Sequence, residues 1–369
     1  MTQSGVVNVL VVDDSAVVRQ VLRELISSEP GMRVQVAGDP QIAESKMRRL
    51  RPDVIILDLE LPVMDGLSWL RRLMAQDPLP VIVCSAQVGD AAIPAIRALE
   101  EGAIEVVTKP RLGVRDFLVE SREPLLEAIR AAVGARVGLH RPCGPRPSAK
   151  PPRAALRSGS ARAVGAGERL IAIGASTGGP QALEAILSAL PADSPPILIA
   201  QHMPGAFTPA FARRLDELCA ISVREAADGE EVARGTALIA PGGRHLKLRP
   251  GRPGTPYRIE LDDGPTVCGH RPSVDVLFTS VAKRAGATAC GVVLTGMGCD
   301  GAAGLLALRQ AGAATLVESE ESCVVYGMPR AALELGGAQT SLPVSDIARR
   351  LCALAREAGA TAAESRDGG

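Results

Sequence analysis

The feature that most constrains the fold is a repeated alternation of short apolar runs with amphipathic segments. Residues 7–133 hold five apolar runs of strand length, separated by patterns with the 3.6-residue period of a helix. The alternation resumes at residue 168 and continues to about residue 356. Strands that alternate with helices form parallel sheets with helices on both faces. The sequence therefore predicts an α/β protein with two doubly wound parallel sheets.

The expected elements differ in pattern between the two regions. The first region has short, mostly apolar strands at 7–14, 33–38, 53–58, 80–86 and 105–110. Its helical patterns lie around 15–29, 41–50, 66–76, 91–101 and 121–135. In the second region we expect strands at 170–174, 197–201, 236–240, 290–295 and 314–318, with an extra hairpin strand at 257–263. Helices are expected there at 179–190, 207–219, 274–286, 301–311 and 344–356.

A stretch of different composition separates the two regions. Residues 135–165 contain seven Lys or Arg, five Pro, four Gly and no acidic residue. This composition is typical of a flexible linker, although a basic arm that contacts a membrane or nucleic acid is an alternative. We expect a first domain at 6–130, a linker at 134–167 and a second domain at 168–358.

Composition excludes several functional classes. The 369 residues include 41 basic and 41 acidic side chains and 2% aromatic residues, so neither charge nor stacking favours binding to nucleic acid. The eight cysteines include no CxxC pair, which gives no support to a zinc or thioredoxin-like site. The chain shows neither a signal peptide nor a membrane span. We therefore expect a cytoplasmic protein with reduced cysteines.

Polar residues end four of the five strands expected in the first region. Asp13 and Asp14 end the first strand, Asp58 the third, Ser85 the fourth, and Lys109 the fifth. In parallel α/β sheets function gathers at this edge. Mg²⁺ would relieve the repulsion between three carboxylates, and one of them could then accept a phosphoryl group that the lysine and serine stabilise. Each residue alone could be a surface acid or a helix cap, but the combination favours a site.

The stretch LIAIGASTGGP at 170–180 places Ser176 between a predicted strand and a predicted helix. It fits G-x-S-x-G, in which a nucleophilic serine follows a strand, and the helix beginning near Gly179 would favour developing negative charge. A phosphate-binding loop would need a Lys followed by Ser or Thr, and a dinucleotide fingerprint would need glycine at Ser176. The stretch therefore favours a serine hydrolase, while a serine that only caps the helix remains an alternative.

A serine nucleophile needs a histidine base and an acid. His202 follows the next predicted strand, so we expect it at the same sheet edge as Ser176. Asp300 follows the strand at 290–295 in a glycine-rich loop and is the predicted acid.

Two alternatives concern the acid and the base. Asp300 is also well placed to cap the helix expected at 301–311. The order Ser, acid, His of the α/β-hydrolases would instead combine Ser176 with Asp228 or Asp262 and with His270.

The first region resembles the receiver domain of two-component response regulators. The resemblance rests on VVDDS, DVIILDLELPVMDG, CSA and VVTKP and covers roughly residues 6–130. It implies phosphorylation by a histidine kinase in the presence of Mg²⁺. The implied roles are the phosphorylated residue Asp58, the metal ligands Asp13, Asp14, Asp58 and the Glu60 carbonyl, and the switch residues Ser85 and Lys109. Many receivers have an aromatic residue where this chain has Val106 or Val107, so an aromatic switch is not expected.

The second region resembles the catalytic domain of the chemotaxis protein-glutamate methylesterases. IGASTGGPQAL, AQHMP, APGG, RPSVDVLF, LTGMGCDG and CVVYGMPR carry the resemblance over roughly residues 168–356. It implies a Ser176–His202–Asp300 triad, with Thr177 and Met297 near the oxyanion and the substrate cleft, and no cofactor in this half. The implied reaction is hydrolysis of glutamate methyl esters on chemoreceptor helices, with release of methanol. The resemblance also implies deamidation of receptor glutamines as a second activity. It further implies that the protein contacts the membrane only through the receptors.

Three other functions fit parts of the sequence. A receiver fused to a DNA-binding domain would carry a smaller, basic second domain. A general esterase would act on simple esters, and an inactive hydrolase fold would lack the triad that is present here. The sequence favours a phosphorylation-regulated methylesterase over all three.

Overall fold

A computed structural model describes residues 5–62, 64–86, 92–109, 115–138, 169–251 and 257–364, with the side chains at 115–121 and 355–364 left out. The chain divides into two compact units, within 1–141 and 142–369. Most of the linker expected at 134–167 lies outside the described residues. The three boundaries expected from the sequence stay predictions.

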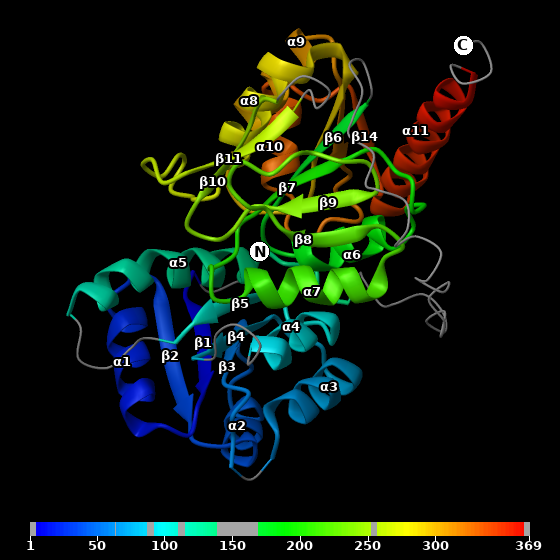
Figure 1. The fold of residues 1–369 in the computed structure, drawn as a ribbon. Coiled ribbons are helices and arrows are strands. Elements are labelled where there is room, and N and C mark those ends of the chain that lie inside the picture. Colours follow the sequence, from blue (N-terminus) through cyan, green and yellow to red (C-terminus); the bar gives the residue numbers. More distant parts are fainter. Residues whose placement is uncertain are drawn as a thin grey trace. The chain divides into compact units, whose positions relative to one another are not determined.

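The first unit is a parallel sheet with the strand order β2-β1-β3-β4-β5 and helices on both faces (Figure 1). The strands are β1 (Val7–Val12), β2 (Met32–Ala37), β3 (Val54–Leu57), β4 (Val81–Ser85) and β5 (Glu105–Thr108). The helices are α1 (Ala16–Ser27), α2 (Pro40–Met47), α3 (Gly66–Gln76), α4 (Ile93–Glu100) and α5 (Arg115–Val133). Because β1 pairs with both β2 and β3, the strand order reverses beside β1, where ligands bind in such sheets.

Local sequence explains how these elements form. β3 and β4 are buried along their whole length, which is why their sequences are continuous apolar runs rather than alternating ones. Helix α1 begins after Ser15, whose hydroxyl accepts a hydrogen bond from the N–H of Val18. One face of α1 is buried and carries Val18, Leu22, Leu25 and Ile26 at helical spacing.

The second unit contains a seven-stranded parallel sheet with the order β14-β13-β12-β6-β7-β9-β8 and a separate antiparallel hairpin, β10-β11 (Figure 1). The sheet strands are β6 (Leu170–Ala175), β7 (Ile197–Gln201), β8 (Ser222–Glu225), β9 (Thr236–Ile239), β12 (Ala289–Val293), β13 (Ala314–Glu318) and β14 (Thr340–Leu342). The hairpin strands are β10 (His245–Pro250) and β11 (Tyr257–Asp262). The helices are α6 (Gly179–Leu187), α7 (Thr208–Leu218), α8 (Val274–Ala285), α9 (Ala302–Gln310), α10 (Met328–Glu334) and α11 (Val344–Glu364).

The prediction of two doubly wound parallel sheets is confirmed. The sequence missed β8, β10, β14 and α10. The strands β8 (SVRE) and β14 (TSL) lie at the two edges of the sheet, are short, and are only partly buried. An edge strand packed on one side does not need an apolar run, so the hydrophobic pattern carries little signal there. Among the described residues, no helix is both long and apolar enough to cross a membrane.

Candidate phosphoacceptor and hydrolase sites

The residues predicted at the strand ends of the first unit meet in one acidic cluster. Asp13 and Asp58 are 1% and 2% exposed, while Asp14 is exposed, and oxygens of the three carboxylates lie within 4.8 Å of one another. The Lys109 ammonium lies 2.9 Å from Asp13 Oδ2 and 2.6 Å from Asp58 Oδ2. Ser85 ends β4 as a buried residue. The structure thus brings the predicted carboxylates and lysine together.

The cluster has the charge pattern of a cation site. Burial raises the pKa of Asp58, although Lys109 and the backbone N–H of Glu60 oppose this. Burial works against the Lys109 ammonium, but Asp58 and Asp13 outweigh it and raise the pKa of Lys109. In the described part of the chain, the buried Oδ2 atoms of Asp13 and Asp58 meet only this ammonium. A hard divalent cation suits such oxygen donors, so the residues fit Mg²⁺.

The backbone holds the Asp58 peptide close to the start of α3. A Cβ atom at Gly66 would lie 2.5 Å from the carbonyl oxygen of Asp58 and 2.7 Å from Cα of Leu59. The N–H of Gly66 donates to the carbonyl of Leu59, and the N–H of Glu60 donates to Asp58 Oδ1 at 3.1 Å. Glycine at 66 is therefore required by a close backbone approach that fixes the turn carrying Asp58.

In the second unit, Ser176 lies at the carboxyl end of β6, directly before α6. Its N–H donates to the carbonyl of Thr295 at 3.0 Å, and its carbonyl accepts from the N–H of Gly179 at 2.7 Å. The left-handed conformation of this turn falls on Gly178, at φ 78°. Among the described residues Cys268 alone has a positive φ without being glycine. Ser176 is thus presented on a sharp turn whose unusual backbone geometry glycine supplies.

His202 lies beside Ser176 because their strands are neighbours. β6 and β7 pair in register up to Ala175 and Gln201, so Ser176 and His202 each follow the last paired residue of a strand. The N–H of His202 donates to the carbonyl of Ala175 at 3.0 Å. The buried Gln201 side chain donates to the carbonyls of both Ser176 and His202, at 2.9 and 3.0 Å. The structure contains no hydrogen bond between the described side chains of Ser176 and His202.

His202 and Asp300 form a buried pair. His202 Nε2 lies 2.9 Å from Asp300 Oδ2, and because an ionised carboxylate can only accept, Nε2 carries the proton. The side chains of His202 and Asp300 are 7% and 1% exposed. The other ring nitrogen, Nδ1, is buried and has no partner in the described part of the chain. Nδ1 is therefore free to accept a proton.

One interpretation of the sequence was that Asp300 caps the helix that follows it. The structure shows that it does not. The N-cap of α9 is Gly301, which offers no side chain. Asp300 Oδ1 instead accepts from Ser273 Oγ at 2.8 Å and from the N–H of Asp275 at 3.0 Å, and Oδ2 accepts from the N–H of Val274 at 2.7 Å. Asp300 thus caps α8, which begins 26 residues earlier at Val274.

These contacts determine the charge of Asp300. Its burial favours the neutral acid, but the hydrogen bond and charge of His202, with the N–H groups of Asp275 and Val274, outweigh burial and lower the pKa of Asp300. The lowered pKa favours the ionised form of Asp300, which can stabilise a protonated imidazole of His202.

The two other histidines that the structure describes, His245 and His270, have different surroundings. His245 is 2% exposed, and it accepts from the N–H of Ser273 through Nδ1 and contacts the carbonyl of Pro265 through Nε2. His270 stacks on His202 with ring centroids 3.8 Å apart and 14° between the planes. Burial and the charge of His202 lower the pKa of His270 to about 4, so His270 is neutral at physiological pH.

The alternative with Asp228 or Asp262 as the acid is not supported by contacts. Asp228 accepts from the N–H of Leu261, and Asp262 pairs with Lys247 and accepts from the N–H of Gly264. Neither carboxylate bonds to His270 among the described residues. The stacking of His270 on His202 was missed because adjacency of two rings from distant loops leaves no periodic pattern in the sequence.

A loop after β12 packs against the Ser176 turn. A Cβ atom at Gly296 would lie 2.7 Å from Cβ of Ser176, and Met297 follows as a half-buried residue. Thr177 is 4% exposed, and its carbonyl accepts from Thr295 Oγ1 at 2.9 Å. Of the two residues expected near the oxyanion, Thr177 therefore belongs to the Ser176 turn, and Met297 belongs to the loop that packs against it.

A buried glutamate that the sequence did not single out supports this loop. Glu318 ends β13 with 0% exposure, accepts from the N–H of Thr295 at 2.9 Å and accepts from Ser322 Oγ at 2.9 Å. Burial raises the pKa of Glu318, although both hydrogen bonds oppose this.

The fold and the two clusters define a two-domain protein. A receiver-type α/β unit with an acidic cluster precedes an α/β unit in which Ser, His and Asp residues lie as in a hydrolase. Comparison with known families agrees with this class. Residues 9–115 match the response regulator receiver domain, and residues 171–351 match the CheB methylesterase family.

Curated relatives extend over nearly the whole chain. The protein-glutamate methylesterase/protein-glutamine glutaminase 5 of Anaeromyxobacter dehalogenans is 53% identical over 358 residues, which cover 96% of this chain and 98% of the relative. The protein of the same type from Escherichia coli K12 is 48% identical over 348 residues, covering 94% and 96%. The crystal structure of the Thermotoga maritima CheB methylesterase catalytic domain is 39% identical, with a TM-score of 0.49 over 51% of this chain and 98% of that chain. The chain belongs to the protein-glutamate methylesterase/protein-glutamine glutaminase family.

Proposed function

We propose that this protein is a phosphorylation-regulated serine hydrolase that removes methyl groups from glutamate methyl esters of chemoreceptors and deamidates receptor glutamines. The names of relatives that match it over 94–96% of its length support the substrate. The observation that carries the chemistry is the hydrogen bond between His202 and Asp300 beside the Ser176 turn. The reaction would take place in the cytoplasm, on helices of the chemoreceptors.

The geometry supports one assignment of roles. Ser176 attacks the ester carbonyl while His202 Nδ1, the buried nitrogen without a partner, takes the hydroxyl proton. Asp300 holds Nε2–H and stabilises the imidazolium that forms. The protonated His202 then donates to the leaving methoxide, and methanol departs from the acyl-enzyme. Water, activated by the same nitrogen, releases the glutamate carboxylate. For a glutamine side chain the same steps release ammonia.

The developing negative charge on the carbonyl oxygen needs donors. The Ser176 turn enters α6 directly, so the positive end of that helix faces the reaction. Thr177 follows Ser176 in the same turn, and Met297 belongs to the loop that packs against Ser176, so we assign both to the oxyanion and the substrate cleft. His270 covers one face of the His202 ring and holds its plane.

In the receiver unit, Asp58 is the proposed phosphoacceptor and a histidine kinase the proposed phosphodonor. Asp13, Asp14, Asp58 and the Glu60 carbonyl would hold Mg²⁺, which supplies charge neutralisation when bound. The Lys109 ammonium contacts both buried carboxylates and, after phosphorylation, would bind the phosphoryl oxygens instead. Ser85 is the second proposed switch residue.

Release of methanol from methylated receptor membranes tests the proposal. The wild-type protein should release methanol, and a small-molecule phosphodonor should increase the rate. Ser176→Ala should lower kcat by roughly 10⁶, by analogy with the loss of the nucleophile in subtilisin. Turnover close to wild type in a folded Ser176→Ala protein would refute the assignment of the nucleophile.

A further inference from the structure

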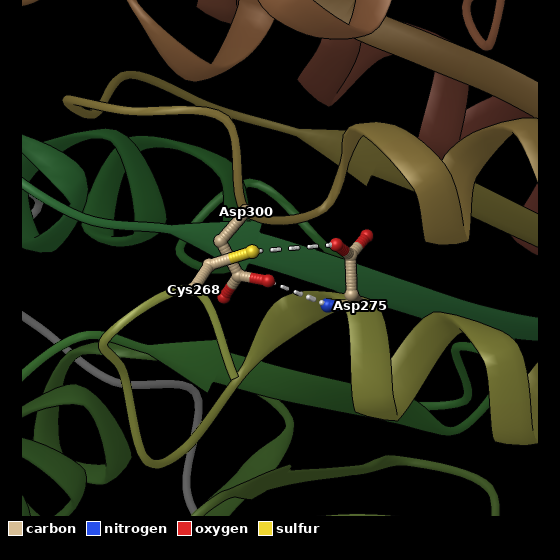
Figure 2. A group of neighbouring side chains, drawn as sticks. All are labelled: Cys268, Asp275 and Asp300. Carbon is tan, nitrogen blue, oxygen red and sulfur yellow. Dashed lines mark hydrogen bonds between the residues drawn. The ribbon is translucent and has the colours of Figure 1, made fainter. Parts of the chain in front are cut away.

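Two aspartates exchange helix caps beside the hydrolase site. Asp300, which precedes α9, accepts hydrogen bonds from the N–H groups of Val274 and Asp275 at the start of α8. Asp275, in the first turn of α8, accepts through Oδ1 from the N–H of Gly304 in the first turn of α9, at 2.6 Å. Each helix therefore begins with its N–H groups bound by a carboxylate of the other helix. Figure 2 shows Asp300 and Asp275 with the hydrogen bond between them.

The packing of the two helices makes this exchange possible. A Cβ atom at Gly304 would lie 2.7 Å from Cβ of Phe278 and 3.0 Å from Cα of Asp275. Glycine at 304 thus lets the start of α9 approach the backbone of α8 within hydrogen-bond reach of Asp275. Both helices contribute side chains to the same hydrophobic core, among them Leu277 and Phe278 from α8 and Leu305 from α9.

The same carboxylates lie near a thiol, which raises the question of a metal site. Cys268 Sγ lies 4.0 Å from Asp275 Oδ2, and ligand atoms of Cys268, Asp275 and Asp300 lie within 4.8 Å of one another (Figure 2). Both oxygens of Asp300 already accept two hydrogen bonds each, from Ser273, Asp275, Val274 and His202. Coordination of a metal by Asp300 would break these caps. The arrangement is therefore that of helix capping rather than metal binding.

We propose that Asp275 is a positioning residue for the hydrolase reaction, which it influences by fixing Asp300 and by adding negative charge behind the His202–Asp300 pair. The inference rests on the proposed function of Ser176, His202 and Asp300. The Oδ1 contact to Gly304 ties the start of α9 to α8, and Asp300 lies next to Gly301, the N-cap of α9. The carboxylate oxygens of Asp275 and Asp300 lie within 4.8 Å of each other. Burial and the charge of Asp300 raise the pKa of Asp275, although the N–H of Gly304 opposes this. Once Asp275 is ionised, its charge behind Asp300 stabilises the imidazolium of His202.

Asp275→Asn separates charge from capping. The amide oxygen can still accept from Gly304, but the charge is lost. Without it the protonated form of His202 is less stable, so the acid limb of the kcat/KM profile should move to lower pH by on the order of one unit. The same loss should lower kcat about tenfold, with KM unchanged. Methanol release from methylated receptor membranes across pH 5–9 gives both quantities.

Controls separate this role from a structural one. Asp346→Asn makes the same change in the first turn of α11 and should match wild type in kcat and in pH profile. Thermal unfolding of each variant reports stability. If Asp275→Asn does not fold, Asp275→Ser, which keeps an acceptor without charge, takes its place in the same assay.

Each outcome decides the proposal. A displaced acid limb with reduced kcat in a folded variant supports it. A profile and kcat equal to wild type, or a kcat that falls only in step with thermal stability while the acid limb stays in place, overturns it. Ser176→Ala, measured in parallel, keeps the two claims apart. An active Ser176→Ala protein would refute the proposed function, whereas an inactive one beside a wild-type-like Asp275→Asn would refute the inference alone.

Discussion

Replacement of Asp300 by Asn tests the two roles of this carboxylate, which caps helix α8 and binds His202. Asn often caps a helix as well as Asp does, but Asp300 accepts four hydrogen bonds through its two oxygens. The amide of Asn has one oxygen, so its NH₂ group must face one pair of donors. If the NH₂ group takes the place of Oδ1, it faces Ser273 and Asp275, and the N–H of Asp275 loses its acceptor. If the NH₂ group takes the place of Oδ2, it faces Val274 and His202. The N–H of Val274 then loses its acceptor, and His202 must take the opposite tautomer.

Both orientations carry a cost that can be estimated. One buried backbone N–H without a partner costs about 1–3 kcal/mol. For a domain of this size the melting temperature falls by about 2–4 °C for each kcal/mol. Activity should fall further, because the charge that stabilises the imidazolium is lost. General acid–base catalysis contributes about 10²–10⁴, and the corresponding Asp→Asn change in a serine protease lowers kcat by about 10⁴.

We therefore expect Asp300→Asn to lower kcat by about 10²–10⁴ and to lower the melting temperature. Methanol release and thermal unfolding measure the two effects. Asp65→Asn is the matched control, because Asp65 is an exposed N-cap of α3 that, among the described residues, accepts only from the N–H and hydroxyl of Ser68, and it should change neither. An Asp300→Asn protein that is less stable but retains nearly full kcat would show that Asp300 is only a cap.

The remaining predictions concern a buried acid and the receiver. Burial raises the pKa of Glu318 in the folded protein above the value of 4.5 for an exposed glutamate. The free energy of unfolding therefore falls as the pH rises above 4.5, because the folded protein resists ionisation of this side chain. Glu318→Gln should thus raise the melting temperature at pH 8 by about 2–4 °C for each kcal/mol removed and change it little at pH 4; equal shifts at both pH values would contradict this. For regulation, a fragment beginning near residue 165 should be more active than the unphosphorylated full chain, and Asp58→Asn should stay at the low rate with a phosphodonor. A fragment less active than the full chain would show that the receiver activates.

Much of both sites could be predicted because buried parallel strands leave a strong signal. A fully buried strand is an apolar run, and the residue after it lies at the functional edge of the sheet. That reasoning brought Asp13, Asp58 and Lys109 to one cluster. It also placed His202 beside Ser176, because consecutive strands β6 and β7 are neighbours.

The rest depended on contacts that no local pattern encodes. The donors that bind Asp300 come from the start of α8, which the chain reaches through the loop after β11. The same loop brings His270 onto His202, and its Cys268 and Gly269 both have positive φ, at 52° and 81°. Sequence periodicity describes regular elements, so it could not determine where this irregular loop would pack. The helix-cap interpretation of Asp300 identified the right chemistry but the wrong helix.

The position of α8 links the segments of the proposed nucleophile, Ser176, and the proposed acid, Asp300. Its first residue, Val274, packs against both Gly174 and Gly301, where a Cβ atom would lie 2.1 and 2.6 Å from Val274 Cγ1. Gly174 precedes Ser176 by two residues, and Gly301 follows Asp300. The glycines therefore let the start of α8 lie close to the segments of both the nucleophile and the acid. Because the N–H groups of the same helix start bind Asp300, any side chain added at either glycine would displace the helix and the carboxylate together. The rigidity that fixes the geometry of the site thus comes from helix packing, and the triad residues are themselves part of that packing.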